Sequence, residues 1–463
     1  MKKSLLILPL ALALLASSCA QTPAPVAPAS RDEALSRLDF RQVVQAAKDK
    51  VFPAVVFIKC LQETMETGKK VTQAVAGSGV AISPSGEVLT NRHVVDKAVE
   101  IRCLLRDGRA MNARIIGTDK DTDLALLQLE LPKDAKTVPY AELGEDSCKL
   151  KEGDFVMAMG APWGLARSVS IGIISCTCRY LPGSSEYSLW LQTDASICPG
   201  NSGGPLVNTD GKVVGINALA ITRGGDMGFA IPAETLRLVA ERLRQFKEMN
   251  WSWTGIQLQP LKDFDKNIYF DADSGVIVAE TDPESPARRA GLRMHDRITR
   301  INGQPVTGER EEDLPAIRRI LGLLPKNEKA AFELVREGQV LQFEIVPRVK
   351  GKVEGEELDC PRWDFTVKSI NQFDNPDLHF YRTKGVFVYG IKYPGNAAQS
   401  GLADQDIILK IDGKEVTTLD DVKAIHEASL KTVKDKHRIV IVLLRGGLER
   451  QVVLDFGRNY ERE

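Results

Sequence analysis

Short apolar runs separated by turn residues dominate the first half of the chain. They are rich in β-branched residues, are broken by glycine, serine and proline, and lie at 55–58, 79–82, 87–90, 154–159, 168–175, 189–192 and 213–216. Many short strands at near-regular spacing predict an all-β barrel or sandwich. Behind Pro232, apolar residues recur at helical spacing (Leu236, Val239, Ala240 and Leu243) and predict a closing helix over 233–246.

The second half of the chain repeats itself after a shift of about 110 residues, which is visible without any other sequence. The aligned pairs include Trp253 with Trp363, 275–278 with 385–388, 290–292 with 400–402, Asp296 with Asp406, and Gly303 with Gly413. The repeat predicts two copies of one small module, each about 95 residues long. The charged, glycine-containing stretch 349–357 is the predicted linker between them.

Composition narrows the class of protein. A length of 463 residues is typical of about three domains. The hydrophobic share of 43% and the charged share of 27% are those of a soluble globular protein. The net charge is −1, so electrostatics offers no argument for binding to nucleic acid or to an anionic membrane surface.

The N-terminus has the layout of a secretory signal. Lys2 and Lys3 precede the apolar run 5–15, which is too short to span a bilayer. Two processing schemes remain open. Residues 18–20 form a small-residue cleavage site, whereas 15–19 resemble a bacterial lipoprotein box with Cys19 as the lipidated residue. The Pro/Ala-rich stretch after Cys19 favours the second scheme, with 1–20 as signal and 21–39 as tether.

Seven cysteines follow Cys19, and an odd number cannot pair completely. Export permits disulfides, but the sequence assigns none. Cys176 and Cys178 have no second pair at the spacing of zinc ligands, which favours half-buried strand thiols over a metal site.

One glycine-rich turn carries the strongest chemical signal. In 198–205, Cys-Pro-Gly-Asn-Ser-Gly-Gly-Pro, Ser202 lies among glycines that can expose its hydroxyl and aim backbone N–H groups at one point. His93 is the only histidine before residue 295, and Asp123 begins an apolar strand that predicts a buried, oriented carboxylate. Singly these residues fit a loop, a strand end and a turn cap. Together they have the order His-Asp-Ser of a serine-protease triad.

Six segments around these residues resemble the HtrA/Deg family of trypsin-fold serine proteases over residues 40–248. They are 77–80, 90–95, 122–126, 192–195, 199–205 and 228–232. The resemblance implies a mainly β fold, with two six-stranded β-barrels and a triad of His93, Asp123 and Ser202 between them. It also implies an oxyanion hole on the backbone of Gly200, Asn201 and Ser202, and no metal or cofactor.

Residues in and around this turn also predict how the enzyme is activated and which substrates it prefers. Asn201 lacks the charge with which digestive relatives capture a newly cut N-terminus, so activation is expected through loop rearrangement. The predicted substrate pocket is small and uncharged and is formed by Ser196, Ile197, Ala218, Leu219 and Ala220. Cleavage is therefore expected after small aliphatic residues. Cys198 replaces a usual asparagine and either narrows this pocket or joins a disulfide; the sequence leaves both open.

Both repeated copies resemble PDZ domains, α+β modules that bind the C-terminus of an extended peptide as an added strand. The copies are predicted at 250–349 and 361–460, with a linker at 350–360. The peptide-binding loop of the first copy is predicted from Thr254, Gly255, Ile256, Gln257 and Leu258. In the second copy Phe365 replaces Gly255 and Asp364 adds a negative charge, which argues against peptide binding there.

Three functions remain in view. The first is an exported, ATP-independent endopeptidase that removes unfolded or misfolded envelope proteins. The second is a regulatory protease activated by a peptide on its PDZ domain, and the third is a chaperone or binding module. The triad argues against the third as the sole role, the short segment 61–76 keeps the second open, and two PDZ copies favour the first. The resemblance further implies a periplasmic homotrimer or larger assembly, with its contact near 40–56. The lipoprotein-like segment 15–19 predicts that the protein is anchored to the membrane through Cys19.

Overall fold

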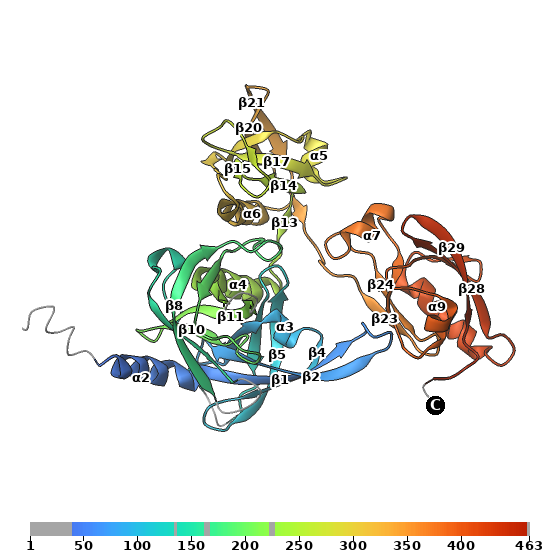
Figure 1. The fold of residues 1–463 in the computed structure, drawn as a ribbon, viewed down its shortest axis with the longest axis horizontal. Helices are drawn as coiled ribbons and strands as arrows, with labels where there is room; N and C mark the ends of the chain where they lie inside the picture. The colour runs from blue at the N-terminus through green and yellow to red at the C-terminus, as the bar shows by residue number, and fades with distance from the viewer. Residues whose placement is uncertain (1–38, 134–136, 162–166, 222–226, 461–463) are drawn as a thin grey trace, which may run out of the picture.

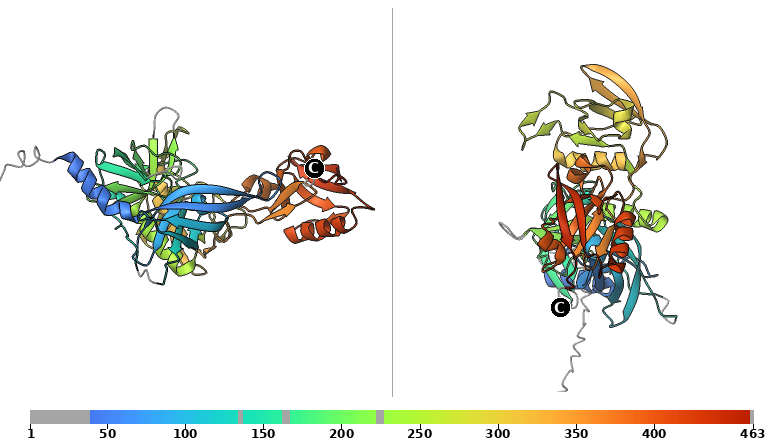
Figure 2. Two further views of the ribbon diagram at one scale, coloured as in Figure 1. Left: turned by 90° about the horizontal axis from the view of Figure 1, so that it is seen from below. Right: turned by 90° about the vertical axis from the view of Figure 1, so that its right-hand side faces the viewer.

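The computed structural model describes residues 39–133, 137–161, 167–221 and 227–460. The predicted signal segment and Cys19 lie outside these residues. Two closed β-barrels come first along the chain, and two smaller sheet modules follow them (Figure 1). Helix α2 and the last module lie at opposite ends of the molecule in Figures 1 and 2. None of the described helices combines the length and the hydropathy that a bilayer crossing requires.

The first barrel closes through the strand order β1-β2-β3-β6-β5-β4. Its strands are β1 (Val55–Thr64), β2 (Val71–Ala81), β3 (Glu87–Asn91), β4 (Ala98–Leu104), β5 (Ala110–Asp119) and β6 (Leu124–Leu129). Strand β6 is apolar at nearly every position because the barrel interior covers one face and a helix covers part of the other. Strands β4 and β5 escaped the sequence analysis because polar residues alternate along them.

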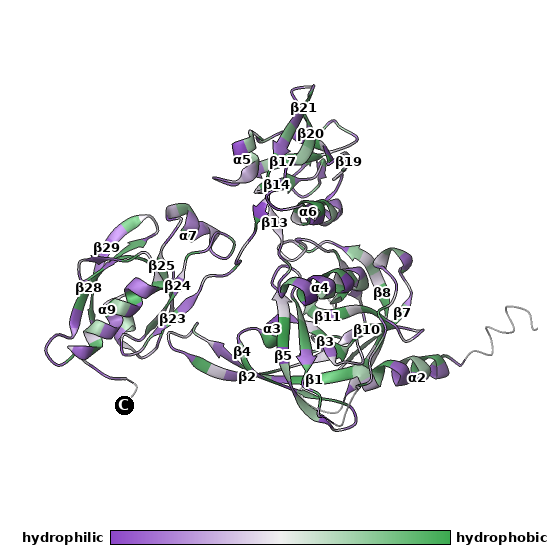
Figure 3. Cartoon of the chain, turned by 180° about the vertical axis from the view of Figure 1, so that it is seen from behind, coloured by the Kyte–Doolittle hydropathy of each residue, from purple (hydrophilic) through white to green (hydrophobic). Residues whose placement is uncertain are grey.

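The second barrel closes through the order β10-β11-β12-β9-β8-β7. Its strands are β7 (Phe155–Gly160), β8 (Ser168–Arg179), β9 (Trp190–Thr193), β10 (Pro205–Asn208), β11 (Val213–Ile221) and β12 (Met227–Pro232). The predicted mainly β fold with two six-stranded barrels is thereby confirmed. In Figure 3 the hydrophobic residues follow the strands and one face of the helices.

Three helices accompany the barrels: α2 (Phe40–Val51), α3 (Arg92–Val95) and α4 (Ala233–Phe246). The helix predicted behind Pro232 has the bounds of α4, and its buried residues Leu236, Val239 and Leu243 join the barrel core. Helix α4 ends at Lys247, whose left-handed backbone turns the chain toward the first module.

The first module is a sheet with the order β14-β17-β18-β20-β21, so β14 forms one of its edges. It comprises β14 (Ile256–Gln259), β15 (Lys262–Asp263), β16 (Ile268–Tyr269), β17 (Val276–Thr281), β18 (Arg297–Ile301), β19 (Gln304–Pro305), β20 (Ala330–Arg336), β21 (Gln339–Ile345), α5 (Pro286–Ala290) and α6 (Leu314–Gly322). Strands β13 (Ser252–Trp253) and β22 (Arg348–Val349) pair with each other where the chain enters and leaves this module.

The second module repeats this sheet and adds a strand, in the order β23-β24-β25-β26-β28-β29. It comprises β23 (Glu357–Cys360), β24 (Phe365–Ser369), β25 (Val386–Ile391), β26 (Ile407–Ile411), β27 (Lys414–Glu415), β28 (Arg438–Arg445), β29 (Leu448–Asp455), α7 (Pro376–Tyr381), α8 (Asn396–Ser400) and α9 (Leu419–Lys431). Strand β23 arises from the end of the stretch that the sequence analysis placed in the linker.

A buried ion pair recurs in both modules. Asp296 accepts two hydrogen bonds from Arg336, at 2.6 and 2.7 Å, and Asp406 accepts two from Arg445, both at 2.6 Å. Each aspartate also accepts a backbone N–H three residues before it. The repeat alignment revealed the two aspartates, but their arginine partners lie about 40 residues further on and were not recognised.

The long hairpin β1–β2 projects out of the first barrel and reaches the second module, as Figure 1 and the left view of Figure 2 show. At its tip the carbonyl oxygen of Met65 accepts a hydrogen bond from Thr366 Oγ1 at 2.6 Å. Tyr389 donates its hydroxyl to Glu66 at 3.0 Å. The hairpin therefore ties the two barrels to the last module of the chain.

Candidate active site

His93 lies in α3, the short helix that follows β3. Its Nδ1 atom is 2.7 Å from Asp123 Oδ2, and its backbone N–H donates to Asp123 Oδ1 at 3.0 Å. One carboxylate therefore holds both the ring and the backbone of His93. With Nδ1 engaged, Nε2 is the ring nitrogen that can accept a proton.

Asp123 occupies the residue before β6 and has a left-handed backbone, with φ of 53°. Its carbonyl oxygen accepts hydrogen bonds from Arg92 N at 2.9 Å and Asn91 Nδ2 at 3.2 Å. The side chain remains 31% exposed, so the expectation of a buried carboxylate is wrong. The chain turns at the barrel rim just before the strand, which leaves this residue outside the apolar core.

The buried carboxylate of this turn is Asp119, which the sequence analysis did not single out. It is 7% exposed and accepts hydrogen bonds from Thr122 N, Thr122 Oγ1 and Trp251 Nε1, at 2.9, 2.6 and 3.1 Å. Burial, reinforced by the neighbouring Asp121, raises the pKa of Asp119 to about 6. Asp119 thus anchors the turn that carries Asp123 and joins it to the start of the first module.

Ser202 lies on the turn between β9 and β10, in the second barrel. Gly200 and Gly203 beside it have φ of 100° and 82°, values that a side chain would strain. The Ser202 hydroxyl donates to the carbonyl oxygen of Ala218 at 3.2 Å. Within the described part of the chain no hydrogen bond joins Ser202 to His93. Proton transfer to His93 requires the Ser202 hydroxyl to give up its hydrogen bond to Ala218.

Ser78 of the first barrel holds this turn of the second barrel. Its backbone N–H donates to Ser202 O at 2.8 Å, and its hydroxyl donates to Gly200 O at 2.6 Å. The same hydroxyl accepts the N–H of Ala161 at 2.9 Å. Ser78 is fully buried, so its side of each bond is shielded from solvent. The sequence signal for it was the segment 77–80, which had been noted without a role for this serine.

The predicted oxyanion hole is the backbone of the same turn. The N–H groups of Gly200 and Ser202 have no hydrogen-bond partner among the residues that the structure describes, whereas the Asn201 N–H donates to Cys198 O at 2.9 Å. The Asn201 side chain is buried against Gly160, where an added Cβ would lie 2.4 Å from Asn201 Oδ1. Two donors are therefore available beside the Ser202 hydroxyl.

The predicted pocket residues lie on both sides of this turn. Ile197 packs against Gly228 of β12, where an added Cβ would lie 2.7 Å from its Cδ1 atom. Ser196 is exposed and accepts a hydrogen bond at its carbonyl oxygen from Ser170 at 2.6 Å. Ala218, Leu219 and Ala220 belong to β11. Cys198 is a free thiol whose sulfur lies 3.6 Å from Ser196 Oγ.

Comparison with protein families agrees with this geometry. The trypsin-like peptidase domain model matches residues 77–216, and the PDZ domain model matches residues 254–346, which is the first module. The probable periplasmic serine endoprotease DegP-like of Marinomonas sp. (strain MWYL1) is 37% identical over 351 residues, covering 74% of this chain and 72% of the relative. The protein of the same name from Pseudomonas savastanoi pv. phaseolicola is 42% identical over 381 residues, covering 80% and 76%.

The chain belongs to the HtrA/DegP family of serine endoproteases. Solved structures of HtrA-type proteases also align with this chain. The HtrA-type protease AlgW with tripeptide aligns with a TM-score of 0.57 and 30% identity, over 66% of this chain and 97% of that one. The serine endoprotease from Yersinia pestis aligns with a TM-score of 0.51 and 30% identity, over 66% and 97%.

The peptide-binding loop predicted for the PDZ domain of this HtrA/DegP protease leads into β14. Thr254 and Gly255 precede the strand, while Ile256, Gln257 and Leu258 belong to it. Gly255 has φ of 72°, and an added Cβ would lie 2.2 Å from the Cβ of Ser285. Only glycine fits this turn without displacing α5.

Removing the Ser78 hydroxyl should disturb catalysis more than binding. In Ser78→Ala the carbonyl of Gly200 and the N–H of Ala161 lose their shared partner, so the nucleophile turn loosens. We expect kcat to fall about tenfold to a hundredfold with little change in KM, measured on a peptide substrate. Ser85→Ala, in the exposed turn between β2 and β3, is the matched control. An unchanged kcat in Ser78→Ala would contradict the role of this clamp.

The raised pKa of Asp119 predicts a pH-dependent stability. Because the native state holds this proton more tightly than the unfolded chain does, the free energy of unfolding should fall as pH rises from about 4 to 6. The loss should amount to about 3 kcal/mol and be absent in Asp119→Asn. Denaturant unfolding of both proteins across this pH range isolates the residue. Parallel profiles for the two would show that Asp119 does not titrate this way.

Proposed function

We propose that Ser202, His93 and Asp123 form the catalytic triad of this endopeptidase. The hydrogen-bonded pair of His93 and Asp123 is the observation that carries the proposal, because an oriented imidazole with a free Nε2 is the base that a serine nucleophile needs. Ser202 attacks the scissile carbonyl after rotating toward His93, which takes its proton and passes it to the leaving amine. Asp123 stabilises the imidazolium that forms.

The oxyanion of the tetrahedral intermediate is bound by the backbone of Gly200, Asn201 and Ser202, with the N–H groups of Gly200 and Ser202 as donors. Their lack of other partners within the described residues supports this role. Ser78 acts through the turn and is a positioning residue.

The substrates are unfolded or misfolded proteins of the bacterial envelope, and the names of the relatives support a periplasmic location. A regulatory role is the second candidate. It is favoured by one observation, the Ser202 hydroxyl bonded to Ala218 rather than to His93, which is the geometry expected of an enzyme that a ligand activates.

Further features extend the proposal. The second module is a second PDZ domain, supported by its repeated sheet order and buried Asp–Arg pair.

Residues 1–20 direct export, and Cys19 carries a lipid anchor that the mass of the mature protein would reveal. The enzyme forms a homotrimer or larger assembly through the region of α2. Two exposed aromatic side chains support a contact there, since Phe40 and Phe155 lie with ring centres 4.6 Å apart. Light scattering by the purified protein measures the size of the assembly.

Casein degradation tests the catalytic assignment. Ser202→Ala should reduce cleavage to background, because the acyl-enzyme cannot form without the serine hydroxyl. Rapid cleavage by the parent protein without added peptide supports quality control, whereas dependence on an added C-terminal peptide supports the regulatory role. Retention of full proteolysis in Ser202→Ala would refute the triad.

The pocket beside Ser202 predicts the preferred cleavage site. Ile197 against Gly228 and the absence of charge at Ser196 favour Val, Ala or Ile before the scissile bond, because a small apolar pocket cannot solvate a cation. Profiling with a peptide library measures the preference. A strong preference for Lys or Arg would contradict this description of the pocket.

A further inference from the structure

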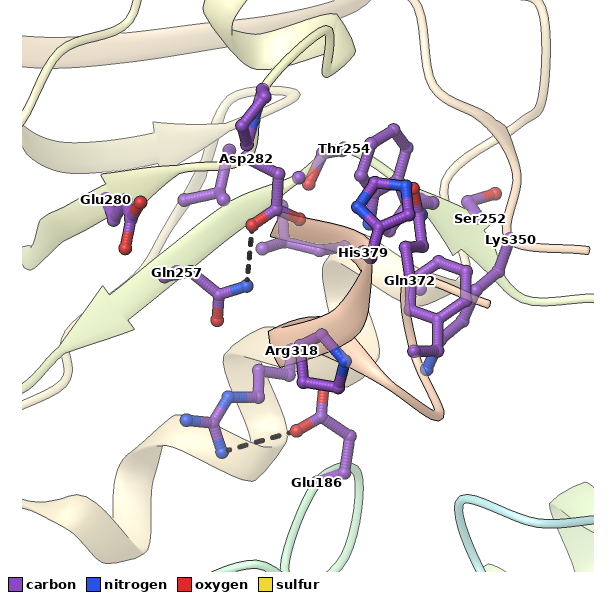
Figure 4. A pocket seen from close by; sticks show the side chains of 18 of the residues that line it. Glu186, Ser252, Thr254, Gln257, Glu280, Asp282, Arg318, Lys350, Gln372 and His379 are labelled. Carbon is purple, nitrogen blue, oxygen red and sulfur yellow. Dashed lines mark hydrogen bonds and ion pairs between the residues drawn. The ribbon is translucent and has the colours of Figure 1, made fainter. Parts of the chain in front are cut away.

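A cavity of about 400 Å³ lies where three parts of the chain meet. The PDZ domain contributes the edge strand β14 and helix α6, the second barrel contributes the loop at Glu186, and the second module contributes helix α7 (Figure 4). In Figure 4, His379 of α7 lies over the same space that Gln257 of β14 and Arg318 of α6 border. Helix α7 of the second module therefore forms one wall of the groove beside β14 of the PDZ domain.

The PDZ edge in this cavity is open. Strand β14 pairs with β17 on one side, and no described strand pairs with its other side. Its unpaired backbone groups are a template for an added strand. An extended peptide placed here lies between β14, α6 and α7.

The equivalent edge of the second module is already closed. Strand β23 pairs antiparallel with β24 through Glu357 to Cys360, at the position where a peptide would add to the sheet. Helix α9 secures the end of this segment, because His426 Nε2 lies 2.8 Å from the carbonyl oxygen of Pro361. The charge of Asp364 is also paired, at 3.0 Å from Lys392. The second module therefore holds its own chain as a strand-like ligand.

Helix α7 is firmly placed beside the open groove. Asp374, just before the helix, accepts a hydrogen bond from Lys120 of the first barrel and forms an ion pair with Lys368, both at 2.8 Å. Phe373 meets Trp253 edge-on, with ring centres 6.1 Å apart. Phe380 lines the cavity yet is 85% exposed, and its ring meets the neighbouring Tyr381 edge-on, with ring centres 5.5 Å apart.

We propose that the second module selects the peptide that the PDZ domain binds, through the aromatic wall of Phe380 and Phe373. The proposal rests on the proposed function, in which the PDZ domain binds C-terminal peptides. Alternate side chains of an extended peptide point to opposite sides. Those that point away from α6 meet α7, where an aromatic side chain gains contacts that a small polar one does not.

Two labelled peptides test this selection. Both are fluorescein-labelled octapeptides of glycine and serine, one ending in Trp-Val and the other in Ser-Val. Fluorescence anisotropy measures their Kd on the full chain carrying Ser202→Ala, which prevents cleavage. We expect the Trp-Val peptide to bind about fivefold more tightly, and this preference to fall below about twofold in Phe380→Ala.

Tyr393→Ala is the matched control. Tyr393 is another exposed aromatic residue of the second module, 82% exposed, but it does not line the cavity, so the preference should survive its removal. Versions of both peptides with amidated C-termini distinguish two claims: that the PDZ domain binds a free C-terminus, and that α7 selects among such peptides. If the free-acid peptides bind equally well and the amides do not, the PDZ assignment stands and the selection by α7 is overturned. If no peptide binds, or if amides bind as well as acids, the PDZ assignment fails and the proposal with it.

Discussion

The proposed active site depends on a junction between two barrels. His93 and Asp123 lie on the first barrel and Ser202 on the second, so no local segment can set the distances within the proposed triad. Ser78 bridges the two with hydrogen bonds to Ser202 and Gly200. Buried hydrogen bonds of this kind cannot exchange with water, so they hold the turn in one place. The remaining freedom is the side chain of Ser202 itself, which is bonded to Ala218.

A second junction connects the triad to the modules. Asp119 holds the turn of Asp123 on one side and the indole of Trp251 on the other, and Trp251 stacks on Tyr187 with ring centres 3.9 Å apart. Lys350, which leaves the PDZ domain, pairs with Asp121 at 2.8 Å. Contiguous packing and an ion pair therefore connect the PDZ domain with the turn that carries Asp123.

The two modules show how one repeated sequence can acquire two roles. Both form the same sheet and the same buried pair of aspartate and arginine. Four residues of extra strand, Glu357–Cys360, close the edge in the second module and leave the first as the open one. The closed module instead contributes α7 to the cavity beside the open edge, and its proposed role in peptide selection lies on that surface.

The sequence by itself determined much of this protein. Apolar runs located several strands in each barrel, and apolar residues at helical spacing located the bounds of α4. Both patterns are visible because side chains that face a core must be apolar. Chain order and glycine spacing singled out His93, Asp123 and Ser202, and the repeat revealed Asp296 and Asp406. Local patterns carry this information because it concerns backbone geometry and residue chemistry.

Only the tertiary structure decided which groups meet. Ser78 and Asp119 have ordinary local sequences, and each meets a partner that is far away in the chain, Gly200 and Trp251. The tertiary structure also places Asp123 on the rim of the barrel, whereas the sequence predicted a buried carboxylate. Contacts between distant segments depend on how whole barrels and modules pack, and no single window of the sequence records that packing.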